Sequence, residues 1–111
     1  MWEKVYRGTY KIIKMIKDLE NEFIGTSDVK GFKFTKLDST DKGFLYSVDP
    51  GEGNIHYEVF YKNIVPLCID FERRIFSETE FKYSYPSSEK FGSSAWCITN
   101  YDKAVEKLNN L

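Results

Sequence analysis

The sequence is poor in the residues that catalytic and disulfide-bonded sites most often use. It contains one histidine, two cysteines and three prolines among 111 residues. Two cysteines are too few for a disulfide framework and both lie within apolar runs, so we expect Cys68 and Cys97 to be buried free thiols. A thiolate is disfavoured in such surroundings, which argues against a catalytic pairing of either cysteine with His56.

Recognisable metal motifs are also lacking. His56, Cys68 and Cys97 fall in three separate predicted strands, without the close spacing of zinc ligands. Asp70 followed by Glu80-Phe81-Lys82 is the pattern of a metal-dependent nuclease, but in the expected strand register the two carboxylates lie roughly 20 Å apart. We therefore predict no catalytic residue, no metal and no cofactor, and keep a metal-dependent enzyme as the least favoured alternative.

No run approaches the ~20 apolar residues of a membrane-spanning helix. The N-terminus has no basic region followed by an apolar run, so it does not resemble a secretory signal. The formal net charge is −1, and the molecule as a whole therefore attracts neither nucleic acid nor an anionic membrane. These absences predict a cytoplasmic protein without membrane binding.

What is present is typical of a folded domain. Hydrophobic residues make up 41% and charged residues 30% of the chain, which is ordinary globular composition. Aromatic residues make up 17%, and most of them lie in short alternating runs that suit the buried face of a sheet. The length favours one domain, residues 1–111.

The N-terminal stretch has a strong helical period. Its apolar residues recur at spacings of three and four, which predicts an amphipathic helix from Trp2 to Phe23: Trp2, Val5, Ile12, Ile13, Ile16, Leu19 and Phe23. Another side of this helix would carry a basic stripe of Lys4, Arg7, Lys11 and Lys14. Cations in the first half of a helix oppose its dipole, so helix stability does not explain the stripe. It is a candidate contact for nucleic-acid phosphates, and the alternative is an ordinary solvated face.

From Gly31 onward the period changes to two, which predicts strands. They are expected near residues 32–37, 43–48, 55–61, 64–76, 80–85 and 95–98. Pro66 suggests an edge position or a bulge in the fourth strand. A three-residue loop at Ser77-Glu78-Thr79 would place Ile75 opposite Phe81, so that apolar residues meet.

A capping box from Thr99 to Asp102 begins a short C-terminal helix, whose apolar side would hold Ala104, Val105, Leu108 and Leu111. The order of elements predicts an α+β fold. An N-terminal amphipathic helix precedes an antiparallel meander of five or six strands, a short helix follows it, and both helices pack on one face of the sheet.

The segment from Tyr83 to Trp96 is the best candidate for specific recognition. It combines aromatic residues with serines and a charged pair, as the centres of interfaces do. The predicted partner-binding residues are Tyr85, Glu89, Lys90, Phe91 and Trp96. The alternative is that Phe91 turns back to close the core.

The favoured function is a small non-catalytic protein-interaction module, such as an inhibitor, an immunity-type protein or an adaptor. It would bind a protein partner through the 85–96 loop or an exposed sheet edge. Nucleic-acid binding through the basic stripe is the first alternative.

Overall fold

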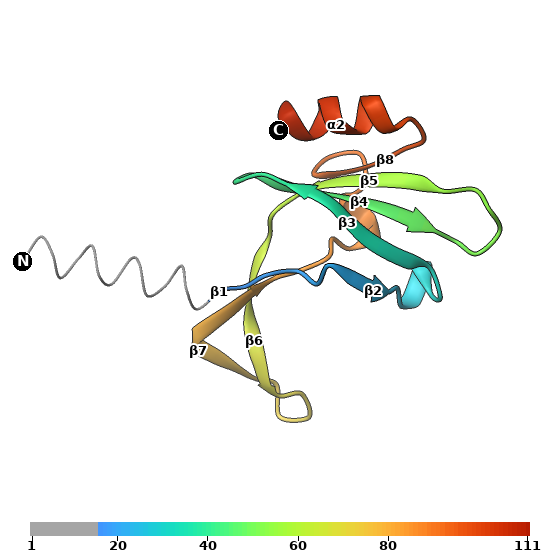
Figure 1. Cartoon of the computed structure of the whole chain (residues 1–111). Helices are drawn as coiled ribbons and strands as arrows, with labels where there is room; N and C mark the ends of the chain where they lie inside the picture. Colours follow the sequence, from blue (N-terminus) through green and yellow to red (C-terminus); the bar gives the residue numbers. More distant parts are fainter. Residues whose placement is uncertain (1–15) are drawn as a thin grey trace, which may run out of the picture. The chain divides into compact units, whose positions relative to one another are not determined.

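The computed structural model describes residues 16–111, which fall into two compact units (Figure 1). The described part of unit 1 comprises residues 16–19 and Asn63–Tyr85, and unit 2 comprises Glu20–Lys62 and Pro86–Leu111. The structure is mostly β, with 48% strand and one C-terminal helix. The prediction of a single domain is not tested by this division and stays a prediction.

Unit 2 is built on a five-stranded antiparallel sheet with the order β2-β3-β4-β5-β8. Its strands are β2 (Glu22–Ile24), β3 (Lys33–Ser39), β4 (Gly43–Asp49), β5 (His56–Tyr61) and β8 (Ala95–Ile98). Short 3-10 helices, η1 (Ser27–Val29) and η2 (Ser88–Lys90), lie in the connections. The sheet edges are therefore β2 and β8.

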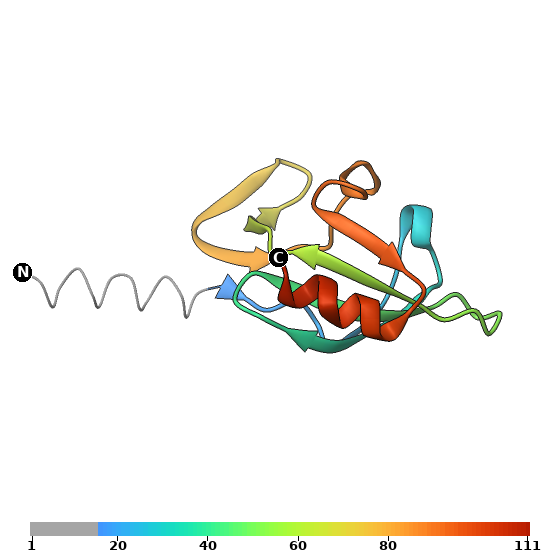
Figure 2. The same cartoon turned by 90° about the horizontal axis from the view of Figure 1, so that it is seen from above.

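One face of this sheet is covered by the C-terminal helix α2 (Tyr101–Asn109), which lies across it (Figure 2). Leu45 of β4 and Val59 of β5 form a buried cluster with Ala104 and Leu108 of the helix. The pair Ala104 and Leu108 has the i, i+4 spacing that places both side chains on one helix face. This explains why α2 presents its apolar side to the strands.

The other face of the sheet carries an aromatic cluster centred on Tyr46. Strand alternation puts Phe44 and Tyr46 on this face, and the register adds Phe60 of β5 and Phe34 of β3. All four are fully buried. Tyr46 stacks on Phe60 at 5.7 Å between ring centroids, and its hydroxyl donates a hydrogen bond to the Glu20 carbonyl at 2.6 Å.

Unit 1 contains a three-stranded sheet with the order β1-β7-β6, made of β1 (Ile16–Lys17), β6 (Ile64–Asp70) and β7 (Ile75–Tyr83). β6 and β7 pair antiparallel, whereas β1 runs parallel to β7 with Ile16 opposite Phe81. Pro66 lies on the edge strand β6, next to a register shift, as predicted.

The position of Pro66 follows from the ladder. Ser84 N–H donates to the Asn63 carbonyl, and bonded pairs alternate with non-bonded pairs in an antiparallel ladder. Ile64 pairs with Tyr83 and Pro66 with Phe81, so both belong to non-bonded pairs. The proline nitrogen therefore points away from β7, where no ladder hydrogen bond is lost.

The predicted fold class is wrong at the N-terminus. Residues 16–17 and 22–24 are strands, not the end of a helix, while residues 1–15 of the predicted helix lie outside the described residues. Phe23 stacks on Phe34 with 4.6 Å between ring centroids, and Ile16 pairs with β7. Pairing with distant strands has thus overridden the local helical period. In residues 16–111 only α2 covers a sheet, so two helices on one face are not observed.

The single meander is also wrong. Strands β2 to β5 do follow one another in the sheet, but β6 and β7 form a separate sheet and β8 returns to pair with β5. The predicted loop at Ser77–Thr79 lies inside β7, because the Ser77 hydroxyl accepts hydrogen bonds from the N–H groups of Thr79 and Glu80 and forms a bulge.

The hairpin between β6 and β7 turns instead at residues 71–74. Asp70 Oδ1 accepts a hydrogen bond from Arg73 N–H at 3.2 Å, which is the side-chain turn typical of aspartate. Arg74 has a φ of 54°, in the left-handed region that closes the turn. Ile75 consequently pairs with Asp70, not with Phe81.

The C-terminal helix is confirmed, with a different cap. The side chain of Asn100, not Thr99, accepts a hydrogen bond from Lys103 N–H at 2.9 Å. Asparagine accepts a hydrogen bond from a free helical N–H as well as threonine does. The helix therefore still begins with a side-chain cap, one residue later than predicted. Across residues 16–111, the structure has no helix of the length and apolarity needed to traverse a bilayer.

Replacing the cap tests the helix start. Asn100→Ala should lower the free energy of unfolding by about 1 kcal/mol, because the Lys103 N–H loses its acceptor. Thr99→Ala is the matched control and should change it by less than about 0.5 kcal/mol. Urea unfolding followed by circular dichroism measures both. A larger loss for Thr99→Ala than for Asn100→Ala would contradict the cap assigned to Asn100.

Replacing the hydroxyl of Tyr46 tests the centre of the aromatic cluster. Tyr46→Phe should cost about 1 kcal/mol of unfolding free energy, since the ring stays and only the bond to Glu20 is lost. Tyr57→Phe is the control, because no hydrogen bond of its hydroxyl is found within residues 16–111. Equal effects of the two substitutions would show that the Tyr46 hydroxyl is not specially held.

Candidate functional site

The predicted recognition loop is held by its own hydrogen bonds. The Lys90 carbonyl accepts bonds from the N–H groups of Ser93 and Ser94, and Gly92 N–H donates to the Ala95 carbonyl at 2.6 Å. Phe91 forms a bridge with Ala95 and is half-buried. The loop is thus a compact turn with Phe91 partly tucked in, and the role predicted for Phe91 stays a prediction.

The other predicted loop residues are divided between the units. Tyr85 belongs to unit 1, whereas Glu89, Lys90 and Trp96 belong to unit 2. Glu89 is exposed, and Lys90 and Trp96 are half-buried.

Trp96 is part of a cluster that combines three elements. It pairs with Val59 of β5 and therefore lies on the sheet face covered by α2. Tyr61, two residues beyond Val59 on the same face, meets the indole edge-to-face with 5.9 Å between ring centroids. Lys107 of α2 places its Nζ 3.9 Å from the centre of a Trp96 ring. We call Tyr61, Trp96 and Lys107 the Trp96 surface.

The geometry of the Trp96 surface restricts the side chain of Lys107. A lysine ammonium over an indole face is held by the ring quadrupole, and tryptophan is the best partner for it. Lys107 also lies in the last turn of α2, where a cation complements the helix dipole. Tyr61 stays exposed. The result is a surface with aromatic and cationic side chains whose positions are already restricted in the absence of a partner.

The edge of β8 next to this surface is partly closed. The bond from Gly92 N–H to the Ala95 carbonyl uses one backbone group of that strand. The strand has only four residues, Ala95–Ile98, so little ladder is left for an added strand. Recognition here depends on side chains more than on strand addition.

His56, Glu58 and Cys97 come together on the opposite face of the same sheet. Glu58 is 3% exposed, and His56 Nε2 lies 3.5 Å from its Oε2. Cys97 is the cross-strand partner of Glu58. Cys97 is exposed as a whole residue, but partial desolvation of its thiol, together with the nearby Glu58 charge, raises the thiol pKa above its ordinary 9.0.

The prediction of buried thiols is wrong for both cysteines, which are free and exposed. Cys68 lies on β6 and Cys97 on β8, and each strand is at the edge of its sheet. Side chains alternate between the faces of a strand, so an apolar run at an edge does not guarantee burial.

The arrangement around Cys97 does not suit nucleophilic catalysis. A reactive cysteine needs a neighbour that stabilises the thiolate, whereas Glu58 destabilises it. No group of three or more His, Cys, Asp or Glu side chains that could hold a metal occurs within residues 16–111. In unit 1, Asp70 is engaged by Arg73, with 3.7 Å between Oδ2 and Nε, and pairs with Ile75, five residues before Glu80 on β7.

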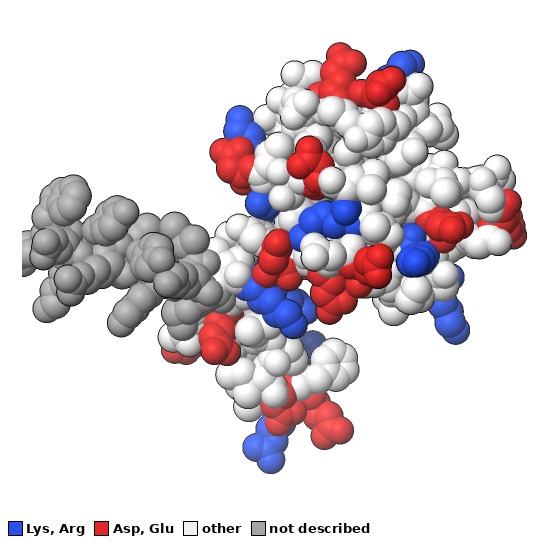
Figure 3. Space-filling view, viewed as in Figure 1, with Lys and Arg blue, Asp and Glu red and all other residues white. Residues whose placement is uncertain are grey.

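The basic stripe of Lys4, Arg7, Lys11 and Lys14 lies outside the described residues. In the described part of the chain, Figure 3 shows cations and anions interspersed over the visible face. Interspersed charges produce a weaker long-range field than a patch of one sign. This face therefore gives no support to phosphate binding.

Trp96 was predicted as a binding residue from the sequence, whereas Tyr61 and Lys107, which contact it, were not. Tyr61 and Lys107 are 35 residues before and 11 residues after Trp96 in the printed sequence. Their proximity requires the pairing of β5 with β8 and the docking of α2, and neither is a local property of the chain. The one usable signal was Lys107 itself, because it lies on an amphipathic helix that was predicted from its period.

The Cys97 environment gives a pH-dependent prediction. In a Cys68→Ser background, the rate of alkylation by iodoacetamide should rise with a midpoint above pH 9.0. Glu58→Gln should lower that midpoint, because the neighbouring negative charge is removed while burial remains. Glu89→Gln, at an exposed loop position, should leave it unchanged. An unaltered midpoint in Glu58→Gln would contradict the electrostatic cause.

The same pKa has a consequence for stability. The pKa of the Cys97 thiol is higher in the folded protein than in the unfolded chain, where it is 9.0. The thiol's contribution to the free energy of unfolding is therefore fully present below pH 9.0 and is lost as the pH rises through the folded-state pKa. Replacing Cys97 with serine should therefore reduce the loss of stability in the alkaline range.

Comparison with known proteins gives no family assignment. No protein-family model, no curated protein and no solved structure matches the chain.

Proposed function

We propose that this chain is a small non-catalytic protein-interaction module acting in the cytoplasm, of the kind found among inhibitors, immunity-type proteins and adaptors. It binds a protein partner through the Trp96 surface and the adjoining loop 86–94. The observation that carries the proposal is the arrangement of Tyr61, Trp96 and Lys107, which joins an exposed tyrosine and a half-buried tryptophan to a positioned cation.

The residue types support a protein partner. Tyrosine and tryptophan are enriched at interface centres, because each buries a large rigid ring and offers one polar group for hydrogen bonding. The contact with Trp96 restricts Lys107 before binding, which lowers the entropy lost when a partner orders that side chain. A complementary partner would offer an apolar contact for Tyr61 and an acidic group for Lys107.

The adjoining loop supplies the polar rim that interfaces require. Ser87 Oγ approaches Glu89 Oε1 at 3.4 Å, and the Ser93 hydroxyl donates to the Lys90 carbonyl at 3.0 Å. These short-range bonds favour the observed conformation of the loop. A loop held in this way can bind with little rearrangement, as pre-organised interfaces do.

Nucleic-acid binding through the basic stripe stays a prediction. Its four cations lie outside the described residues, and the formal charge of the whole chain is −1. Binding by a few phosphate contacts would weaken steeply with salt, which separates it from binding at an aromatic surface.

Retention experiments test the proposal. The immobilised full chain is exposed to lysate of the cells that produce it, and retained proteins are quantified by mass spectrometry. Tyr61→Ser/Lys107→Glu should reduce retention of a specific partner by about tenfold or more, since loss of one strong anchor costs at least about 1.4 kcal/mol. Titration of the purified partner then gives the change in affinity directly.

Phe71→Ser is the matched control, because it removes an exposed aromatic side chain in unit 1. It should retain the partner as well as the unaltered chain does. Circular dichroism and thermal unfolding establish that both variants fold. Partner retention that is insensitive to Tyr61→Ser/Lys107→Glu, or lost equally with Phe71→Ser, would refute the proposed surface.

A further inference from the structure

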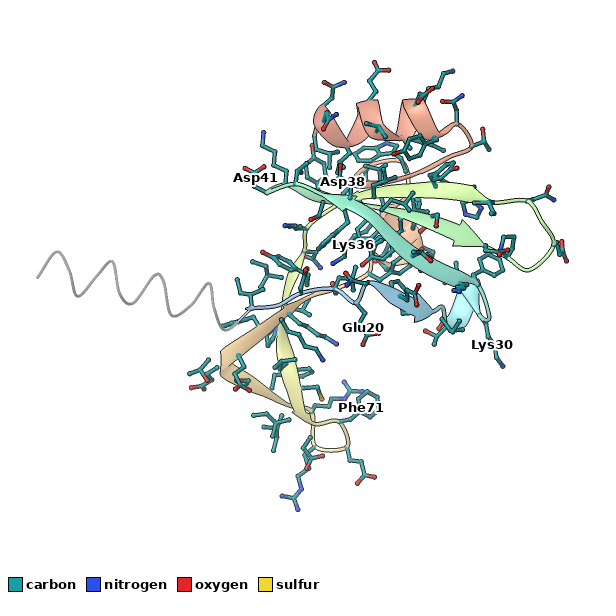
Figure 4. All side chains as sticks on the ribbon, viewed as in Figure 1. Glu20, Lys30, Lys36, Asp38, Asp41 and Phe71 are labelled. Carbon is teal, nitrogen blue, oxygen red and sulfur yellow. The ribbon has the colours of Figure 1, made fainter. Side chains whose placement is uncertain are left out.

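The outer edge of β2 is the sheet edge of the described chain that best suits an added strand. β2 lies between the labelled Glu20 and Lys30 and pairs along one side only, with β3 (Figure 4). The other edges are less suitable, because β6 presents Pro66, β8 is partly closed by its bond to Gly92, and β1 has only two residues.

The ladder between β2 and β3 shows which backbone groups point outward. Lys36 N–H donates to the Asn21 carbonyl at 2.7 Å, and Gly25 N–H donates to the Phe32 carbonyl at 2.8 Å. Asn21 and Gly25 are thus bonded positions. Because bonded and non-bonded pairs alternate in an antiparallel ladder, Phe23, midway between them, is bonded to β3 as well.

Glu22 and Ile24 consequently belong to non-bonded pairs. Their N–H and C=O groups point away from β3, toward the open side of the strand. Both residues are exposed, and Ile24 is 60% exposed. In residues 16–111, no turn or loop residue forms a hydrogen bond with these backbone groups. The edge therefore offers two donors and two acceptors, at alternate positions, to an added strand.

This spacing is complementary to a second copy of itself. When two β2 strands run antiparallel about a two-fold axis at Phe23, Glu22 of each copy lies opposite Ile24 of the other. Both of these are bonded pairs, and each pair exchanges two N–H···O=C hydrogen bonds. The two Phe23 residues face each other in a non-bonded pair, where aromatic side chains pair favourably.

The exposed charges also suit this register. Lys33 of β3 pairs with Ile24, and Glu22 of the second copy lies on the other side of the same isoleucine. Lys33 and that Glu22 are two strand spacings apart, about 10 Å between Cα atoms, and their long side chains can meet over Ile24. The symmetry gives this attraction twice, against one diagonal repulsion between the two Glu22 side chains.

We propose that two copies of the chain associate through antiparallel pairing of their β2 strands, which joins two five-stranded sheets into one. β8 is at the opposite edge from β2, so both ends of the joined sheet carry β8 and Trp96. The pairing therefore leaves the Trp96 surface accessible and is independent of the proposed function. Since β2 has three residues, the interface is small and the association is reversible.

Charge-reversed variants of the full chain test the register. The unaltered chain should form dimers in sedimentation equilibrium at concentrations on the order of 1 mM. Glu22→Lys alone and Lys33→Glu alone place like charges across the axis and should be monomeric under the same conditions. An equimolar mixture of the two variants should associate more tightly than the unaltered chain, because every charge contact across the axis then becomes attractive.

Proline at position 24 tests the backbone bonds. Ile24→Pro removes the outward N–H but none of the N–H groups that bond to β3, and it should weaken the dimer about tenfold or more relative to Ile24→Ala. Ile24→Ala is the matched control, since it shortens the side chain and keeps the N–H. Circular dichroism and thermal unfolding establish that each variant folds.

Isotope-filtered NMR locates the contact. In a mixture of isotope-labelled and unlabelled chains, a cross-peak is expected between the Phe23 Hα protons of the two copies, because these protons face each other in a non-bonded pair.

Two results would overturn the proposal. One is a monomer in both the unaltered chain and the equimolar mixture of Glu22→Lys with Lys33→Glu. The other is a dimer that is as stable in Ile24→Pro as in Ile24→Ala and lacks the Phe23 cross-peak. That second result would assign the association to another surface.

Discussion

The packing around Tyr46 is the interaction on which the sheet of unit 2 depends. Its ring contacts the rings of Phe23, Phe34, Phe44 and Phe60, which come from β2, β3, β4 and β5. One residue therefore joins four of the five strands through side chains as well as through the backbone ladder. Its hydroxyl is satisfied by the Glu20 carbonyl, so the buried ring carries no unpaired polar group at that position.

This arrangement leaves the opposite face of the sheet free to bind α2. Alternation along β4 and β5 turns Leu45 and Val59 away from the aromatic cluster and toward Ala104 and Leu108. The Trp96 surface lies on that face, because β8 pairs with β5 and Lys107 belongs to α2. The Trp96 surface is thus built on two strands and a helix that pack together, and not on a loop. Side chains on packed strands and helices are held more rigidly than side chains on loops.

The sequence predicted those elements whose signals are local. The C-terminal helix carries its own cap and period, and the strands β3 to β5 carry their own alternation, so each was found. The turn after Asp70 was missed, because it depends on a side-chain hydrogen bond and on a left-handed Arg74. The pairing of β5 with β8 was missed because it joins segments more than thirty residues apart. Tyr61 and Lys107 could not be assigned to one site with Trp96 without that pairing.

The two sheets differ in whether a helix covers an apolar face in the described part of the chain. A sheet with an apolar face needs a second layer, and a small group of strands is marginal without one. Unit 2 obtains its layer from α2, which follows β8 directly and brings Ala104 and Leu108 to Leu45 and Val59. The described part of unit 1 contains three strands and no α-helix, while five of its large apolar side chains stay exposed. A helix elsewhere in the described chain cannot serve both sheets at once, since α2 is already committed to β4, β5 and β8.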